Sequence, residues 1–112
     1  MTVNTQVLID SLPQGKLTAD NYRIAESPVP EIGDGEVLVQ TTAFAITAGT
    51  RAGLQGSAGY AGAPTTGVVM NGTGVGVVAA SRAADFAEGD RVLGPTGWQA
   101  YSVQKPLSLI HI

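Results

Sequence analysis

The stretch 67–93 constrains the fold of this chain more than any other part of the sequence. Its first half is rich in glycine, which favours places where backbone lies close to other backbone or to a ligand. The apolar residues that follow, 75–80, are typical of a buried strand. Gly89 and Asp90 then predict a turn, after which residues 91–93 resume an extended chain. Two strands joined by such a turn are typical of the middle of a β-barrel or a β-sandwich.

The length of 112 residues is that of one domain, which can bury a core without help from a metal or a disulfide. Hydrophobic residues make up 44% of the chain, as in ordinary globular proteins, whereas charged residues make up only 13%, about half the usual share. The surface must therefore be unusually neutral, or part of it must be covered.

Charge and composition exclude several classes of function. The formal net charge is −3 and no basic cluster is present, which argues against nucleic acid as a partner. The chain has no cysteine, so disulfides, thiolate nucleophiles and cysteine-based zinc sites are excluded. The N-terminus lacks a basic segment followed by an apolar one, and no apolar run is long enough to cross a bilayer. We therefore expect a cytoplasmic protein without a membrane partner.

Alternating and β-branched patterns predict a mainly β fold with at most one short helix. The longest β-prone stretch contains no proline and is predicted to form the central strand, 36–46. Turn-forming residues recur about every ten residues, as in barrels and sandwiches. The other predicted strands are 6–10, 20–26, 75–80, 91–93 and 98–104.

The stretch 47–64 differs from the rest of the chain, because glycine recurs at every third position from Gly53 to Gly62. A collagen-like helix would need many more such triplets. We therefore predict a mobile loop, with at most one helical turn over 50–54. Long glycine-rich loops in compact domains often carry function.

The chain lacks the side chains of a self-contained active site. No catalytic triad is predicted, because cysteine is absent and the single histidine, His111, lies in an unusual C-terminal segment. Aspartates and glutamates are scattered over predicted turns, which is their ordinary solvated placement. The run 72–76 (Gly-Thr-Gly-Val-Gly) is not the dinucleotide fingerprint, because Val77 stands in the place of its third glycine and a strand follows instead of a helix. A tight bend between strands is the better interpretation.

The last six residues, 107–112 (Leu-Ser-Leu-Ile-His-Ile), differ in kind from the rest of the chain. They match one reading frame of a transposon adapter that is used in sequencing libraries. We therefore expect the domain to span 1–106 and the hexapeptide to be an adapter artefact, with the gene continuing beyond it. No chemistry is assigned to His111 for this reason.

Four short motifs resemble, in chain order, the N-terminal domain of medium-chain dehydrogenases and reductases. They are 36–39 (Glu-Val-Leu-Val), the turn before Ile46, 74–78 (Gly-Val-Gly-Val-Val) and 86–92 (Phe-Ala-Glu-Gly-Asp-Arg-Val). Each motif alone is weak, whereas the four in sequence form a specific pattern. The similarity extends over nearly the whole chain.

The two ends of the matched region are similar to one branch of that superfamily. The pair Pro13 and Gly15, the triplet 20–22 (Asp-Asn-Tyr) and the run 97–101 (Gly-Trp-Gln-Ala-Tyr) resemble the zinc-independent prostaglandin, leukotriene, curcumin and alkenal reductases. The resemblance implies a partly open, GroES-like β-barrel beside a cofactor-binding Rossmann domain, which this chain lacks. It also implies that the parent protein uses NADPH to reduce an activated carbon–carbon double bond or a carbonyl of a small molecule. A homodimer is the assembly that the resemblance suggests for the full-length protein.

Departures from the family patterns agree with a zinc-free site. Thr47 stands where zinc alcohol dehydrogenases have a cysteine ligand, and Gly72 with Thr73 stands where they have a His–Glu pair. The reductase branch carries Asp-Pro-Tyr-Met-Arg before its substrate loop, of which only Arg51 is kept. Gly49 replaces the tyrosine that lines the pocket in that branch, so no specific substrate can be transferred to this chain.

The resemblance assigns candidate site residues to two groups. The substrate-facing candidates are Thr47, Gly49, Arg51 and Tyr60, the last of which matches a second pocket tyrosine of curcumin reductases. The candidates that approach the nicotinamide are Met70, Asn71 and Gly72. The alternatives are a loop aromatic at the core edge for Tyr60, an ion pair for Arg51, and a plain turn for the last two nicotinamide candidates.

A second hypothesis is a stand-alone chaperonin-like binding or assembly module without catalysis. A small barrel with a mobile glycine-rich loop would suit such a module, and a neutral face would be covered by another subunit. Further coding sequence with a strand, a glycine-rich turn and a helix would favour the reductase. A stop codon after Val103 would favour the module.

Overall fold

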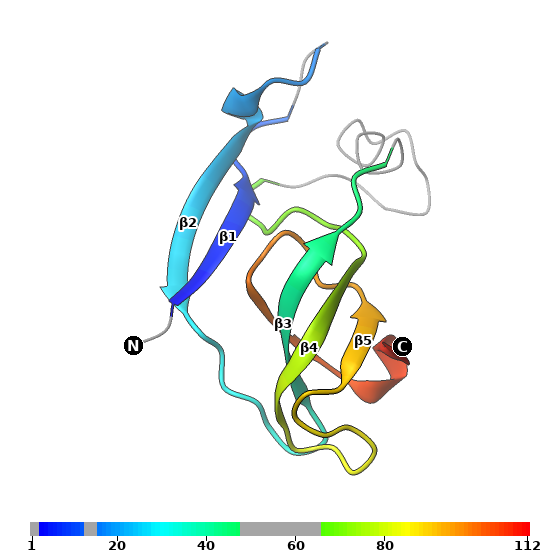
Figure 1. The fold of residues 1–112 in the computed structure, drawn as a ribbon. Coiled ribbons are helices and arrows are strands. Elements are labelled where there is room, and N and C mark those ends of the chain that lie inside the picture. Colours follow the sequence, from blue (N-terminus) through cyan, green and yellow to red (C-terminus); the bar gives the residue numbers. More distant parts are fainter. Residues whose placement is uncertain (1–2, 13–15, 48–65) are drawn as a thin grey trace.

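The computed structural model describes residues 3–12, 16–47 and 66–112, and this part of the chain is built almost entirely from antiparallel strands (Figure 1). Its helical elements are two short 3₁₀ turns, and none of its helices is long and apolar enough to span a bilayer. The elements in chain order are β1 (Val3–Ile9), η1 (Ala19–Asn21), β2 (Tyr22–Pro28), β3 (Val37–Phe44), β4 (Gly74–Ser81), β5 (Arg91–Gly94), β6 (Tyr101–Gln104), η4 (Pro106–Ser108) and β7 (Ile110–His111). The predicted mainly β fold is confirmed.

The strands form two sheets that do not close into a complete barrel. β1 pairs with β2 along its full length, and the other five strands are ordered β6-β3-β4-β5-β7. Isolated bridges join β1 to the segments that precede β6 and β4, Gln6 with Gln99 and Leu8 with Val69. The expectation of a partly open barrel is therefore confirmed.

Alternating valines explain why the five-stranded sheet forms. Val37 and Val39 of β3 point to the same face and are fully buried, and β4 and β5 add Val78 and Val92. Phe86, from the turn between β4 and β5, packs into the same cluster. Burying one such side chain contributes about 1.5–3 kcal/mol relative to leaving it exposed. This cluster is therefore a main source of the stability of the large sheet.

The predicted central strand, 36–46, corresponds to β3, which is an interior strand, but the middle place belongs to β4. The glycines of β4 let the backbone of β3 come close. A Cβ on Gly76 would lie only 2.4 Å from the Gln40 carbonyl oxygen of β3. The run 72–76 thus leads into a closely paired strand and not into a helix.

The last predicted strand, 98–104, is shorter than expected, because β6 begins only at Tyr101. Gly97 has a φ of 67°, a left-handed conformation that favours glycine and turns the chain. Ala100 then donates its N–H to the Thr5 carbonyl of β1 at 2.9 Å. The residues just before β6 therefore join the β1–β2 hairpin to the large sheet.

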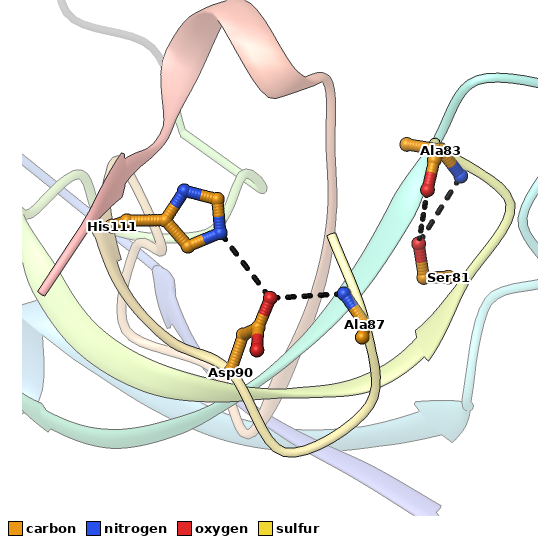
Figure 2. A network of polar contacts seen from close by, with 5 residues as sticks. All are labelled: Ser81, Ala83, Ala87, Asp90 and His111. Carbon is orange, nitrogen blue, oxygen red and sulfur yellow. Dashed lines mark hydrogen bonds and ion pairs between the residues drawn. The ribbon is translucent and has the colours of Figure 1, made fainter. Parts of the chain in front are cut away.

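A turn stabilised by polar contacts of Asp90 connects β4 to β5 (Figure 2). The Asp90 carboxylate accepts a hydrogen bond from the Ala87 N–H at 3.0 Å and lies 3.2 Å from His111 Nε2. These contacts, the one with the Ala87 backbone above all, lower the pKa of Asp90. Gly89 has a φ of 91°, a left-handed conformation that favours glycine, which explains the glycine in this turn.

The C-terminal residues 107–112 extend the large sheet. β7 pairs with β5, and Leu109 is buried against the core cluster. A short apolar segment can pair with an available sheet edge whatever the origin of its codons. The adapter origin of this hexapeptide therefore stays a prediction, which the gene sequence at these positions decides.

Gly76→Ala should lower the free energy of unfolding by about 2–3 kcal/mol, because the added methyl group overlaps the Gln40 carbonyl. Urea unfolding followed by Trp98 fluorescence measures this loss. Gly33→Ala is the matched control, because the atoms near its added methyl group belong to the flexible Glu36 side chain, and it should change stability by less than about 0.5 kcal/mol. Equal losses in the two variants would contradict the close approach of β3 and β4.

Asp90→Asn keeps an acceptor for the Ala87 N–H but removes the charge. Because the folded-state pKa of Asp90 lies below its ordinary value of 3.8, the charge stabilises the fold above that pH, and this stabilisation is lost as the pH falls through the folded pKa. The variant should have a lower Tm than the wild type at neutral pH, and the two Tm values should converge in acid. Glu88→Gln, in the same turn, is the control. A Tm difference for Asp90→Asn that does not vary with pH would refute this assignment.

Candidate functional site

A groove of about 520 Å³ opens between the segment that leads into β4 and the turn that precedes β6. Residues 69–73 form one wall, and residues 95–97 with Gln99 form the other. Ala45 and Thr47, which follow β3, complete the described lining. In Figure 1 the two walls are the green stretch before β4 and the orange stretch after β5.

Three backbone hydrogen bonds close a ring that holds the two walls together. The Val7 N–H donates to the Trp98 carbonyl at 2.8 Å, the Trp98 N–H to the Met70 carbonyl at 2.9 Å, and the Met70 N–H to the Val7 carbonyl at 2.9 Å. A fourth bond joins the Gly97 N–H to the Gly72 carbonyl at 3.0 Å. Because buried backbone groups must be paired, β1 and both walls are held in one arrangement.

Trp98 packs tightly against the wall that contains Gly72. Its ring stacks on Phe44 with the centroids 5.2 Å apart, and its centroid lies 5.3 Å from that of Tyr22. A Cβ on Gly72 would lie only 2.9 Å from the indole Nε1. The packing of Trp98 therefore explains the glycine at this position, because the indole fills the space beside its Cα.

The described part of the groove carries no charged side chain. Its lining residues there include no aspartate, glutamate, lysine, arginine or histidine, and its polar side chains belong to Thr47, Asn71, Thr73, Thr96 and Gln99. Within residues 3–12, 16–47 and 66–112, no three His, Cys, Asp or Glu side chains gather closely enough to hold a metal ion. The groove therefore suits a neutral ligand or the neutral part of a larger one.

Four of the predicted site residues come together in this groove. They are Thr47, Met70, Asn71 and Gly72. Met70 is only 3% exposed and its side chain packs with Ile9, so little of that side chain is accessible to a ligand. Beyond its first residue, the predicted loop 47–64 lies outside the described residues, and with it Gly49, Arg51 and Tyr60. The substrate and nicotinamide roles of all seven stay predictions.

The residues predicted for the site do not include any lining residue of the second wall. These lining residues are Pro95, Thr96, Gly97 and Gln99. The sequence predicts Gln99 as part of a strand and the other three as part of the turn before it. The run 94–97 (Gly-Pro-Thr-Gly) predicts a turn in the chain, but it does not indicate which other segments lie beside that turn. The second wall is positioned by bonds to residues distant in the sequence, so no local pattern could indicate it.

Gly72→Ala should displace the Trp98 indole, because the added methyl group would overlap Nε1 and Cδ1. We expect a loss of about 1–3 kcal/mol in the free energy of unfolding and a shift of the tryptophan emission. Asn71→Ala is the matched control. The Asn71 side chain is exposed, so its removal should leave the free energy of unfolding and the emission unchanged. Identical emission spectra for the wild type and Gly72→Ala would speak against the packing of Trp98 on this wall.

Comparison with known proteins agrees with the fold. Residues 5–112 match the family described as the N-terminal domain of oxidoreductase. The chain is similar to the NADPH-dependent curcumin reductase of Escherichia coli (strain K12), with 30% identity over 109 residues, which are 97% of this chain and 32% of that protein. The chain thus spans about a third of the length of this relative.

Solved structures resemble this chain in the same region. CurA from Vibrio vulnificus has a TM-score of 0.91 at 31% identity, and CurA in complex with NADPH has a TM-score of 0.88 at 30% identity, each over 96% of this chain and 32% of that chain. A human synaptic vesicle membrane protein VAT-1 homolog-like protein, 19% identical, has a TM-score of 0.81 over 100% of this chain and 35% of that chain, which shows the fold alone. With the family match over nearly its whole length, this chain belongs to the family of oxidoreductase N-terminal domains.

Proposed function

We propose that this chain is the substrate-side domain of a longer, NADP(H)-dependent and zinc-independent oxidoreductase, which reduces an activated carbon–carbon double bond or a carbonyl of a small molecule. The main support for it is the groove between residues 69–73 and 95–97, whose described lining residues carry no charge, in a chain of this family. Enones, alkenals and quinones are small and neutral, and they can be buried in such a groove without desolvating a charge. The similarity to an NADPH-dependent curcumin reductase supports the cofactor and the class of reaction.

The described lining of the groove fits the uncharged nicotinamide end of the cofactor and does not fit its phosphates. Hydroxyl and amide groups are present there, but no lysine or arginine is. We therefore assign the phosphates to the part of the protein beyond this domain. Bound NADPH supplies the hydride. Thr47, Asn71 and the backbone around Gly72 orient the substrate against it and exclude water, because hydride transfer needs near-contact distance.

Zinc independence is supported by the side chains at the family's zinc positions. Thr47, Gly72 and Thr73 provide no thiolate, imidazole or carboxylate, and the other described lining residues provide none either. In the proposed reaction the substrate is therefore polarised by hydrogen-bond donors of the protein.

We also propose substrate-side roles for Gly49, Arg51 and Tyr60, which the family resemblance supports. The full-length protein is proposed to be cytoplasmic and homodimeric, with a cofactor domain of the same polypeptide that faces the groove. No observation on the described residues favours the stand-alone binding module.

The test uses the full-length protein, expressed from the gene extended beyond this chain. NADPH absorbance is followed with an alkenal, a quinone and a ketone in turn, and we expect consumption of NADPH with at least one of them. Activity should persist after dialysis against a zinc chelator. Absence of NADPH consumption with all three compounds would contradict the reductase. Loss of activity on chelation, with recovery on addition of zinc, would contradict zinc independence alone.

A further inference from the structure

The side-chain amide of Gln99 links the groove to β1. Its oxygen, Oε1, accepts hydrogen bonds from Asn4 Nδ2 at 3.1 Å and from Gln6 Nε2 at 3.0 Å. Its nitrogen, Nε2, donates to the Thr96 carbonyl at 3.1 Å and lies 3.8 Å from the position that a Cβ on Gly97 would take. Because Thr96 and Gly97 line the groove, the nitrogen side of the amide faces the groove and the oxygen side faces β1.

Backbone groups at both ends of this network determine which end of each amide is oxygen. The Tyr101 N–H can only donate, and it donates to Asn4 Oδ1 at 2.8 Å. Asn4 must then direct Nδ2 toward Gln99 Oε1. At the other end the Thr96 carbonyl can only accept, which requires Gln99 Nε2 beside it. Since Asn4 is only 2% exposed, turning either amide would leave buried polar atoms without partners.

We propose that Gln99 presents an N–H donor to the groove and thereby selects a ligand with a neutral hydrogen-bond acceptor, namely a carbonyl oxygen. An amide nitrogen carries two protons, and within the described part of the chain the Thr96 carbonyl is the one acceptor bonded to it. The second proton is left for a ligand, whereas Asn4 and Gln6 already occupy the oxygen. This inference rests on the proposed function and adds a specificity-determining residue to the same groove.

The carbonyl can come from two sources, an unsaturated ketone or aldehyde substrate and the carboxamide of the nicotinamide. Both present a neutral sp² oxygen that accepts an N–H. A hydrocarbon of the same shape would leave the donor unpaired on binding, so it should bind more weakly. An anionic acceptor would find no opposite charge among the described lining residues.

The experiment uses the full-length protein, with cyclohexenone as the probe and methylenecyclohexene as its hydrocarbon isostere. Gln99→Glu keeps an oxygen for Asn4 and Gln6 but removes the donor, and Gln99→Met removes both ends of the amide without adding charge. Gln6→Met is the matched control, because it removes one bond of the same network and does not line the groove. The readouts are the dissociation constants of both probes from ligand-detected NMR, the Kd of NADPH from its fluorescence, and the Tm.

If the substrate supplies the carbonyl, the wild type should bind cyclohexenone roughly fivefold more tightly than its isostere, and both Gln99 variants should lose this preference while Gln6→Met keeps it. If the carboxamide supplies it, the Kd of NADPH should rise roughly fivefold in the Gln99 variants alone. Either result supports the donor. The proposal is overturned if the Gln99 variants change only the Tm. The protein could also prefer cyclohexenone over its isostere in a Gln99-dependent way and yet consume no NADPH. That result would contradict the reductase function and still support the donor site.

Discussion

The ring of backbone hydrogen bonds between Val7, Met70 and Trp98 holds β1 and both walls of the groove in one arrangement. Each of the three segments donates an N–H to the next one. Displacing any one segment therefore leaves one N–H and one carbonyl of the other two unpaired. A two-stranded hairpin such as β1–β2 is marginally stable alone, and the ring fixes it to the five-stranded sheet. Because the same bonds position both walls of the groove, backbone pairing sets the geometry of the site.

The strands of the large sheet could be predicted because their signals are local. Val37 and Val39 alternate as a half-buried strand requires, and glycine at 89 marks a turn with a left-handed backbone. The order of the strands could not be read in the same way. β4 lies in the middle of the sheet, and Gly76 permits its close approach to β3. Such an approach is a property of the pair of strands and not of either sequence alone.

The candidate site was predictable only in part, and for a different reason. Only a family resemblance points to Thr47 and residues 70–72, because none of them carries distinctive chemistry, and the structure brings them to one groove. Gln99 could not be predicted as a site residue, because the orientation of its amide depends on contacts with Asn4 and Gln6, more than ninety positions away. An amide becomes informative only when its partners fix which end faces the ligand.

A crystal structure of the full-length protein with NADPH and cyclohexenone would show whether the groove is the substrate site. We expect cyclohexenone to lie in the groove between Gly72 and Gln99, beside the nicotinamide, with a ligand carbonyl oxygen within hydrogen-bond distance of Gln99 Nε2. Both molecules bound on another face of the domain, with the groove filled by the protein's own side chains, would contradict it.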